Sequence, residues 1–227
     1  MSYVMTAREL VDKCVDVAKN YKTLYVMGCF GAPMTAANKK RYISNGAASG
    51  YNARSDRANM INAASADTFG FDCVCLIKGI LWGWKGDPGA TYGGAKYAAN
   101  GVPDTNADGM IAMCQCVSKE FTDVQPGEAV WCSGHIGVYI GGGLAVECTP
   151  KWDNRVQITA VGNLGTQAGY NTRSWVRHGK LPWVDYSAQP AAQPVSSEKT
   201  YTAAQVEEIV AAALGEALEG VKKRLNN

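Results

Sequence analysis

The sequence has little net charge, only two histidines and no long apolar run. A formal net charge of +2 over 227 residues gives no strong electrostatic case for a nucleic-acid partner or an anionic membrane. No apolar run approaches the roughly 20 residues of a transmembrane helix, so we expect no membrane insertion. The opening stretch MSYVMTARELVDK lacks a basic start and an apolar core, and so predicts no signal peptide. We therefore expect synthesis in a cytoplasm. To act outside the cell, the protein would have to leave by a route that needs no signal peptide.

Eight cysteines are present, and their even number leaves a disulfide framework open. The missing secretion signal weighs against it, as does a chain long enough to build a hydrophobic core. Two Cys-x-Cys pairs, Cys73–Cys75 and Cys114–Cys116, raise the alternative of zinc. Structural zinc favours wider gaps, and side chains two residues apart point to different sides of a helix or strand. We interpret most of the cysteines as small buried side chains and expect no metal and no cofactor.

The order of the predicted elements, helices first and strands afterwards, indicates an α+β domain. An amphipathic helix is expected over residues 5–20, where Thr6 and Glu9 have the spacing of a capping box. Strands are expected later in the chain, at 129–131, 136–140, 144–147 and 155–159. The turn Gly141–Gly143 would join the second and third of these strands as a hairpin.

The rest of the domain is polar or rich in turn residues. Residues 32–70 contain small and polar side chains, with a break expected at Gly46–Gly50. A lid or substrate wall and plain scaffold are equally open interpretations of this segment. Residues 85–109 have the Gly, Pro, Asp and Asn content of a loop. Short helices are expected at 35–44, 55–65 and 110–118.

The composition changes after Tyr186 and divides the sequence into three parts. Residues 1–186 are predicted to form the folded domain, and residues 187–200, rich in Pro, Ala, Gln and Ser, have linker composition. Residues 201–227 predict one amphipathic helix. A lone helix of about 24 residues is marginal in water, so it must pack on its own domain or on another copy. Of the two we favour a homo-oligomer formed through this helix.

The stretch Phe71–Trp84, FDCVCLIKGILWGW, places a cysteine at the start of a predicted helix. Counted from this cysteine, apolar residues at helical spacing form one buried stripe: Leu76, Ile77, Ile80, Leu81 and Trp84. The unpaired N–H groups and positive pole of a helix start favour a thiolate, so Cys73 is a candidate nucleophile, expected to be partly exposed. Cys75 is rotated about 200° from it and is interpreted as packing.

A cysteine nucleophile needs a base that also protonates the leaving group, and this is normally a histidine. His178 lies in RSWVRHGKLPW, among no other catalytic residue types, and is interpreted as a surface or packing histidine. His135 follows the tight turn Ser133–Gly134 at the start of a predicted strand. It is therefore the better partner for Cys73.

A third residue should orient the imidazole and stabilise its charged form. Glu147 is a glutamate in an otherwise apolar strand, across the predicted hairpin from His135. A suitable register places the two side by side, and a slip of one residue would separate them. Asp153 and Asp72 are the alternatives to Glu147.

Several motifs, in this order, resemble the NlpC/P60 family of cysteine peptidases in its bacteriophage endolysin branch, which is related to CHAP domains. They lie within residues 5–186: YVMGCFG from Tyr25, FDC at 71–73, QPGEAVW at 125–131, GHIGVYIG from Gly134, the turn Gly141–Gly143, the polar Glu147 and WVRHGKLP from Trp175. The resemblance implies a papain-like α+β fold, with N-terminal helices packed on a small antiparallel sheet. It also implies hydrolysis of bacterial peptidoglycan in its peptide stem, after release from a host cytoplasm.

Carried over residue by residue, the resemblance implies that Cys73 is the nucleophile, His135 the base and Glu147 the orienting residue. Tyr25 matches a tyrosine that helps the oxyanion, for which the backbone N–H of Cys73 would be the second donor. We expect Asp72 on the same oxyanion or substrate side of the site.

Departures from the family pattern leave the bond specificity open. Val74–Cys75 stands where Ser-Gly is usual, Glu147 where His, Asn or Gln is common, and residues 32–70 are longer than usual. The cleaved bond is expected to be a stem-peptide amide, with N-acetylmuramoyl-L-alanine amidase as the alternative. Two alternatives from other classes are a wall-binding or assembly module without turnover and a zinc protein that uses the Cys-x-Cys pairs.

Overall fold

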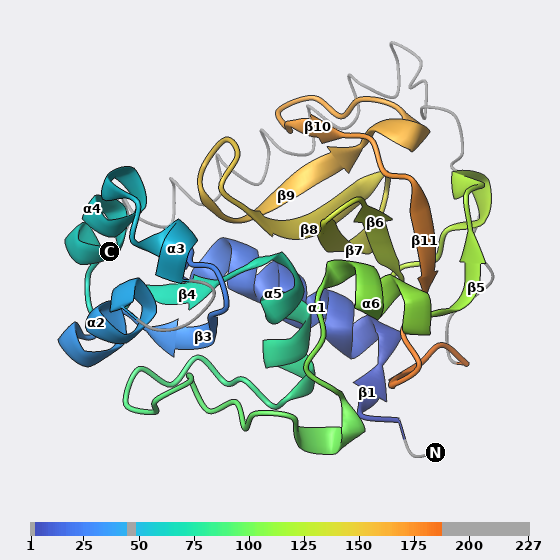
Figure 1. The fold of residues 1–227 in the computed structure, drawn as a ribbon. Helices are drawn as coiled ribbons and strands as arrows, with labels where there is room; N and C mark the ends of the chain where they lie inside the picture. The colour runs from blue at the N-terminus through green and yellow to red at the C-terminus, as the bar shows by residue number, and fades with distance from the viewer. Residues whose placement is uncertain (1–2, 45–48, 188–227) are drawn as a thin grey trace, which may run out of the picture. The chain divides into compact units, whose positions relative to one another are not determined.

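The computed structural model describes residues 3–44 and 49–187, which form an α+β arrangement of helices and a curled sheet (Figure 1). The large sheet has seven strands in the order β10-β9-β8-β7-β6-β11-β5. Its strands are β5 (Gln115–Ser118), β6 (Ala129–Cys132), β7 (His135–Gly141), β8 (Leu144–Thr149), β9 (Arg155–Val161), β10 (Thr172–Arg173) and β11 (Arg177–Lys180). The helices are α1 (Ala7–Asn20), α2 (Ala36–Ser44), α3 (Ser49–Asn52), α4 (Ser55–Ala63), α5 (Cys73–Leu81) and α6 (Ala107–Met113).

Two smaller sheets complete the described residues. One has the order β2-β4-β3, formed by β2 (Thr23–Tyr25), β3 (Phe30–Pro33) and β4 (Phe69–Phe71). The other pairs β1 (Met5–Thr6) in parallel with β12 (Val184–Asp185), and so joins the beginning and the end of the described residues. Three short 3₁₀ turns are η1 (Ala99–Gly101), η2 (Phe121–Asp123) and η3 (Gly162–Leu164).

The large sheet differs from the small antiparallel sheet expected from the sequence. The four predicted strands and their glycine turn are present, but β5, β10 and β11 extend the sheet, and β10 pairs with β9 in parallel. The short strand β11 lies between β6 and β5, antiparallel to both. It satisfies backbone groups of β6 that would otherwise form an open sheet edge. The helix expected over 110–118 ends at Met113, and its second half is β5.

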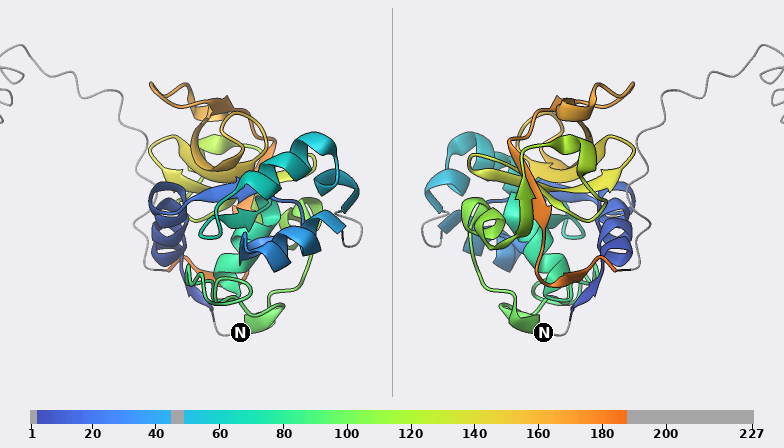
Figure 2. Two further views of the ribbon diagram at one scale, coloured as in Figure 1. Left: turned by 90° about the vertical axis from the view of Figure 1, so that its left-hand side faces the viewer. Right: turned by 90° about the vertical axis from the view of Figure 1, so that its right-hand side faces the viewer.

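The first helix is confirmed with its capping box. Thr6 Oγ1 accepts the N–H of Glu9 at 3.2 Å, and Glu9 Oε2 accepts the N–H of Thr6 at 2.7 Å. The helices expected near 35–44 and 55–65 are α2 and α4. With α3 they gather beside the three-stranded sheet, coloured blue to cyan in Figures 1 and 2. Residues 45–48 lie outside the described residues, so the predicted break at Gly46–Gly50 is described only from Ser49.

Helix α5 is shorter than the apolar stripe that predicted it. It ends at Leu81, and Gly83 follows with a left-handed φ of 88°, a conformation that glycine adopts without strain. Trp84 therefore leaves the helix. Its indole packs edge-on against Tyr21 and Phe71, and Nε1 donates to the carbonyl oxygen of Gly31 at 3.0 Å. The helix end is thus fixed by an aromatic cluster as well as by glycine.

The large sheet has a packed core on each face, because neighbouring residues of a strand point to opposite faces. Helices α1 and α5 cover one face, in a core that includes Leu10, Leu76, Ile80, Val138 and Val146. The other face carries a smaller cluster that includes Phe121, Val130, Tyr139, Ala145 and Trp175. Helix α5 is buried along its whole length, so its first residue is held firmly against the sheet.

Some expectations fall beyond the described part of the chain. Of the linker predicted over 187–200, only its first residue is described, and the helix predicted over 201–227 lies outside the described residues. No helix within residues 3–44 and 49–187 is long and apolar enough to cross a membrane.

A buried ion pair on β11 should make stability depend on pH. His178 Nδ1 bonds Glu128 Oε2, and both side chains are almost fully buried. Burial lowers the pKa of His178, but the hydrogen bond and charge of Glu128 outweigh it and raise the pKa above its usual 6.5. The ion pair therefore contributes its full stabilisation of the fold below pH 6.5, the pKa of an unperturbed histidine. This contribution is lost as the pH rises through the higher pKa that His178 has in the folded protein.

We expect Glu128→Gln to destabilise the protein more at pH 6 than at pH 9, measured by urea unfolding at both values. The variant removes the charge that holds the proton on His178 but keeps the shape of the side chain. An exposed carboxylate change, Asp153→Asn, serves as the control, and its effect should not depend on pH in this range. An equal loss for Glu128→Gln at both pH values would contradict the assignment.

Candidate active site

The candidate nucleophile, Cys73, is the first residue of α5, and Asp72 caps this helix. Asp72 Oδ1 accepts the N–H of Cys75 at 2.7 Å, and its other oxygen accepts the N–H of Gly28, also at 2.7 Å. The carboxylate thus satisfies an unpaired donor of the helix start and fixes the turn between β2 and β3. The structure gives Asp72 this capping contact; its expected role toward an oxyanion or substrate stays a prediction.

The thiol of Cys73 is buried, whereas the sequence predicted partial exposure and a favoured thiolate. Burial, followed by the nearby charge of Asp72, raises the pKa of Cys73 to about 12. Backbone hydrogen bonds from Ile136, Val74 and Cys73 itself act in the opposite direction but are outweighed. The positive pole of the helix is offset by the capping carboxylate beside it. The resting thiol is therefore protonated, and it lies against the backbone of β7 one residue after His135.

His135 and Glu147 form the closest polar contact of the site. His135 Nε2 lies 2.6 Å from Glu147 Oε2. In the β7–β8 register Gly137 is opposite Glu147, so His135 is its diagonal neighbour on the same face of the sheet. His135 is the first residue of β7, and the next residue, Ile136, is the one whose backbone hydrogen-bonds the thiol of Cys73. Because Nε2 faces Glu147, Nδ1 is the ring nitrogen that remains for proton transfer.

Glu147 is completely buried and receives hydrogen bonds from three sides. Arg173 Nε lies 2.9 Å from Oε1 and 2.8 Å from Oε2, and Thr159 Oγ1 donates to Oε1 at 2.7 Å. Burial alone would raise the pKa of Glu147. Hydrogen bonds and charges from His135 and Arg173 outweigh burial and lower the pKa below its usual value. Glu147 is thus a fixed carboxylate that orients the imidazole.

Trp175 covers the face of the imidazole. Its ring stacks on His135 with centroids 5.5 Å apart and planes 9° apart. Gly137 makes room for this indole, because a Cβ there would lie 3.2 Å from Trp175 Cη2 and 2.8 Å from the carbonyl oxygen of Val146. The stack limits rotation of the imidazole and shields its bond to Glu147 from water.

Tyr25, the expected oxyanion donor, lies near Cys73. Burial raises the pKa of Tyr25, with a smaller contribution from the charge of Asp72, so the phenol keeps its proton and remains a donor. Arg57 from α4 donates to the backbone oxygen of Tyr25 and to Asn154 Oδ1, and its guanidinium lies over the Tyr25 ring. The segment 32–70 therefore contacts the wall of the site beside Tyr25.

The remaining candidates lie elsewhere. Asp153 is exposed and pairs with Arg155, and Cys75 is buried inside α5. His178 is buried on β11, paired with Glu128, in a packing role. The eight cysteines are unpaired, and within the described residues no three His, Cys, Asp or Glu side chains gather as a metal site would require.

Sequence reasoning missed Arg173 and Thr159, and it gave Trp175 no role in the site although that residue opens one of the motifs. A glutamate in an apolar strand signals that a partner exists, but nothing in the sequence selects Arg173 from 22 lysines and arginines. It reaches the site through β10, a strand of two residues that no alternation of apolar and polar residues could reveal.

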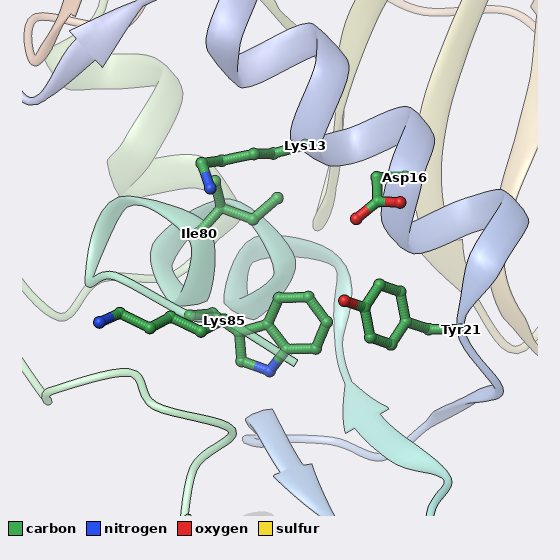
Figure 3. Close-up of a pocket in the computed structure, with 6 residues that line it drawn as sticks. Lys13, Asp16, Tyr21, Ile80 and Lys85 are labelled. Carbon is green, nitrogen blue, oxygen red and sulfur yellow. The ribbon is translucent and has the colours of Figure 1, made fainter. Parts of the chain in front are cut away.

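A small open pocket lies away from this site, between α1 and the end of α5 (Figure 3). Its lining residues are Lys13, Asp16, Tyr21, Ile80, Trp84 and Lys85. Charged side chains surround two aromatic rings there, those of Tyr21 and Trp84, which pack edge-on with centroids 4.9 Å apart. None of the three candidate catalytic residues lines this pocket, so it is separate from the candidate active site.

A scan of the sequence against models of known protein families finds no match, and a search of curated proteins finds none either.

The buried, protonated thiol predicts a particular pH dependence of alkylation. With the pKa of Cys73 raised to about 12, its thiolate fraction should grow steadily between pH 7 and pH 10. We expect the iodoacetamide rate at Cys73, followed by peptide mass spectrometry, to rise about tenfold per pH unit over this range. The exposed Cys116 provides an internal reference for reagent access. A rate at Cys73 that is already constant above pH 7 would show a preformed thiolate and contradict this account.

Proposed function

We propose that this protein is a bacterial cell-wall hydrolase that cleaves a peptide-stem amide of peptidoglycan with Cys73, His135 and Glu147. The observation that carries the proposal is the 2.6 Å contact between His135 and the fully buried Glu147, one residue along β7 from Ile136, whose backbone hydrogen-bonds the thiol of Cys73. A cysteine, a histidine and an orienting carboxylate are the groups that covalent thiol catalysis requires. In this proposal the chain is a papain-like NlpC/P60 domain of the phage endolysin type.

The chemistry begins with a neutral thiol. His135 removes the proton of Cys73 through Nδ1 as the sulfur attacks the amide carbonyl carbon, because the thiol is protonated at rest. The imidazolium then gives this proton to the departing amine, and the C–N bond breaks to leave a thioester on Cys73. Water, deprotonated by His135, attacks the thioester carbonyl, the C–S bond breaks, and the imidazolium returns its proton to the sulfur of Cys73. Glu147 holds the ring in place by its contact with Nε2 throughout these proton transfers.

Two donors are available for the oxyanion of the tetrahedral intermediate. One is the backbone N–H of Cys73 at the start of α5, where a helix leaves its first N–H groups without intrahelical partners. The other is the phenol of Tyr25, which stays protonated in its buried position. Removing one such donor typically costs about 10²–10³ in kcat.

The substrate class is supported by the sequence motifs that resemble NlpC/P60 endolysins. These motifs supply the residues that build the site: Tyr25, Asp72, Cys73, His135, Glu147 and Trp175. The bond is proposed to be an amide between stem-peptide residues, with the amide between muramic acid and L-alanine as the alternative.

The proposed nucleophile can be tested with a matched pair of variants. Cys73→Ala should reduce clearing of purified bacterial cell walls by about 10³-fold or more, because the covalent route disappears. Cys75→Ala removes the same atoms from a buried cysteine on another side of α5, and should retain activity. Turbidity loss measures both, and circular dichroism checks folding.

Two outcomes would overturn this assignment. Loss of activity in Cys75→Ala with activity kept in Cys73→Ala would place the nucleophile elsewhere. Retention of wall binding by a parent protein that clears no wall preparation would support a binding module without turnover. For an active parent, mass spectrometry of the released fragments identifies the bond: an endopeptidase leaves L-alanine on muramic acid, and an amidase removes it.

A further inference from the structure

Glu147 shares one carboxylate oxygen between two cationic or potentially cationic groups. Its Oε2 lies 2.6 Å from His135 Nε2 and 2.8 Å from both Nε and Nη2 of Arg173. The Arg173 side chain is largely buried and the Glu147 side chain entirely so. At such distances, away from water, the guanidinium cancels most of the carboxylate charge that the imidazole experiences.

Arg173 is itself held in one orientation. Its guanidinium lies over the rings of both Trp152 and Trp175, 5.0 Å and 5.5 Å from their centroids. It also donates from Nη2 to Thr149 Oγ1 at 3.3 Å. Trp175 in turn stacks on His135, so an ordered series of side chains leads from Trp152 to the imidazole. These contacts hold the planar guanidinium in one geometry relative to the Glu147 carboxylate, which a mobile surface cation would not keep.

We propose that Arg173 is a positioning residue, which neutralises Glu147 so that the carboxylate orients His135 without trapping a proton on it. This role rests on the proposed function, because His135 must be neutral to accept the proton of Cys73. A lone buried carboxylate 2.6 Å from the ring would strongly favour the imidazolium, which cannot act as a base. The pair of Glu147 and Arg173 keeps the hydrogen bond while offering little net charge.

The other charged or titratable groups near the pair come from several elements. Cys132 on β6 contacts Arg173 and is influenced by Glu147, and Asp108 on α6 lies near Cys132. Cys148 on β8 directly follows Glu147, and Cys73 and its neighbour Asp72, the cap of α5, lie near Cys148. Asp108 is further engaged by Trp131 Nε1 and the N–H of Gly134, at 2.8 Å and 3.0 Å. Within the described residues, Glu147 forms ion pairs with two groups, the imidazole of His135 and the guanidinium of Arg173.

Titration of His135 in the resting protein tests this role without any substrate. The chain has two histidines, so NMR of histidine-labelled protein resolves both, with His178 as an internal control and His135→Gln for assignment. Arg173→Met removes the charge but keeps a long side chain in contact with the two tryptophans. We expect its His135 midpoint to rise by about one pH unit or more. Arg173→Lys, which keeps the charge, should stay near the parent.

The double variant Glu147→Gln/Arg173→Met separates charge from packing. It removes both charges, so the His135 midpoint should return close to that of the parent, while His178 stays constant throughout. In an active protein, the acid limb of the kcat/KM profile should shift to higher pH in Arg173→Met by the same amount as the NMR midpoint. A role in packing alone would lower activity at every pH without moving the limb.

An unchanged His135 midpoint in folded Arg173→Met would overturn the inference. If that variant does not fold, Glu147→Gln is compared with the double variant. The single change leaves Arg173 without its carboxylate, and its His135 midpoint should fall below that of the double variant; equal midpoints would overturn the inference. Failure of the parent to cleave cell walls would overturn the proposed function alone, because these midpoints are read without substrate.

Discussion

Glu147 buries a full negative charge within the large sheet, and the site around it is arranged to compensate for that charge. An uncompensated buried ion costs several kcal/mol, so each donor around it is structurally necessary. The donors come from three strands: His135 from β7, Thr159 from β9 and Arg173 from β10. The sheet register therefore determines the site, since a shift of β7 or β9 by one residue would turn a donor to the opposite face.

A second carboxylate, Asp72, connects the three-stranded sheet to the nucleophile. By accepting N–H groups from Cys75 and Gly28, it fixes the start of α5 against the turn after β2. The same charge, together with burial, keeps the thiol of Cys73 protonated. In the proposed mechanism the two carboxylates have different roles: Glu147, paired with Arg173, orients His135 as the base, and Asp72, the cap of α5, helps to keep the thiol protonated until His135 accepts its proton. The proposed mechanism therefore transfers the proton during the attack and needs no preformed ion pair.

Much of this architecture could be predicted from local sequence patterns. The capping box at Thr6, the glycine turn of the hairpin and the cysteine at the start of α5 are local features, and each was found where the sequence placed it. Features set by distant contacts were missed. Strand β10 contains two residues and β11 only four, so neither shows a usable periodicity, yet they bring Arg173 to Glu147 and close the edge of β6. Burial of Cys73 likewise depends on packing against β7, and the helical spacing of apolar residues in the sequence does not predict that contact.

The central claim is that Cys73, activated by His135, breaks an amide bond in the cell wall. The most direct measurement counts new amino groups and new reducing sugars in purified peptidoglycan incubated with the parent protein and with Cys73→Ala. The account predicts that amino groups increase with the parent alone, in step with the loss of turbidity, while reducing sugars stay at the level of the untreated wall. An increase in reducing sugars, or an equal increase in amino groups with Cys73→Ala, would contradict it.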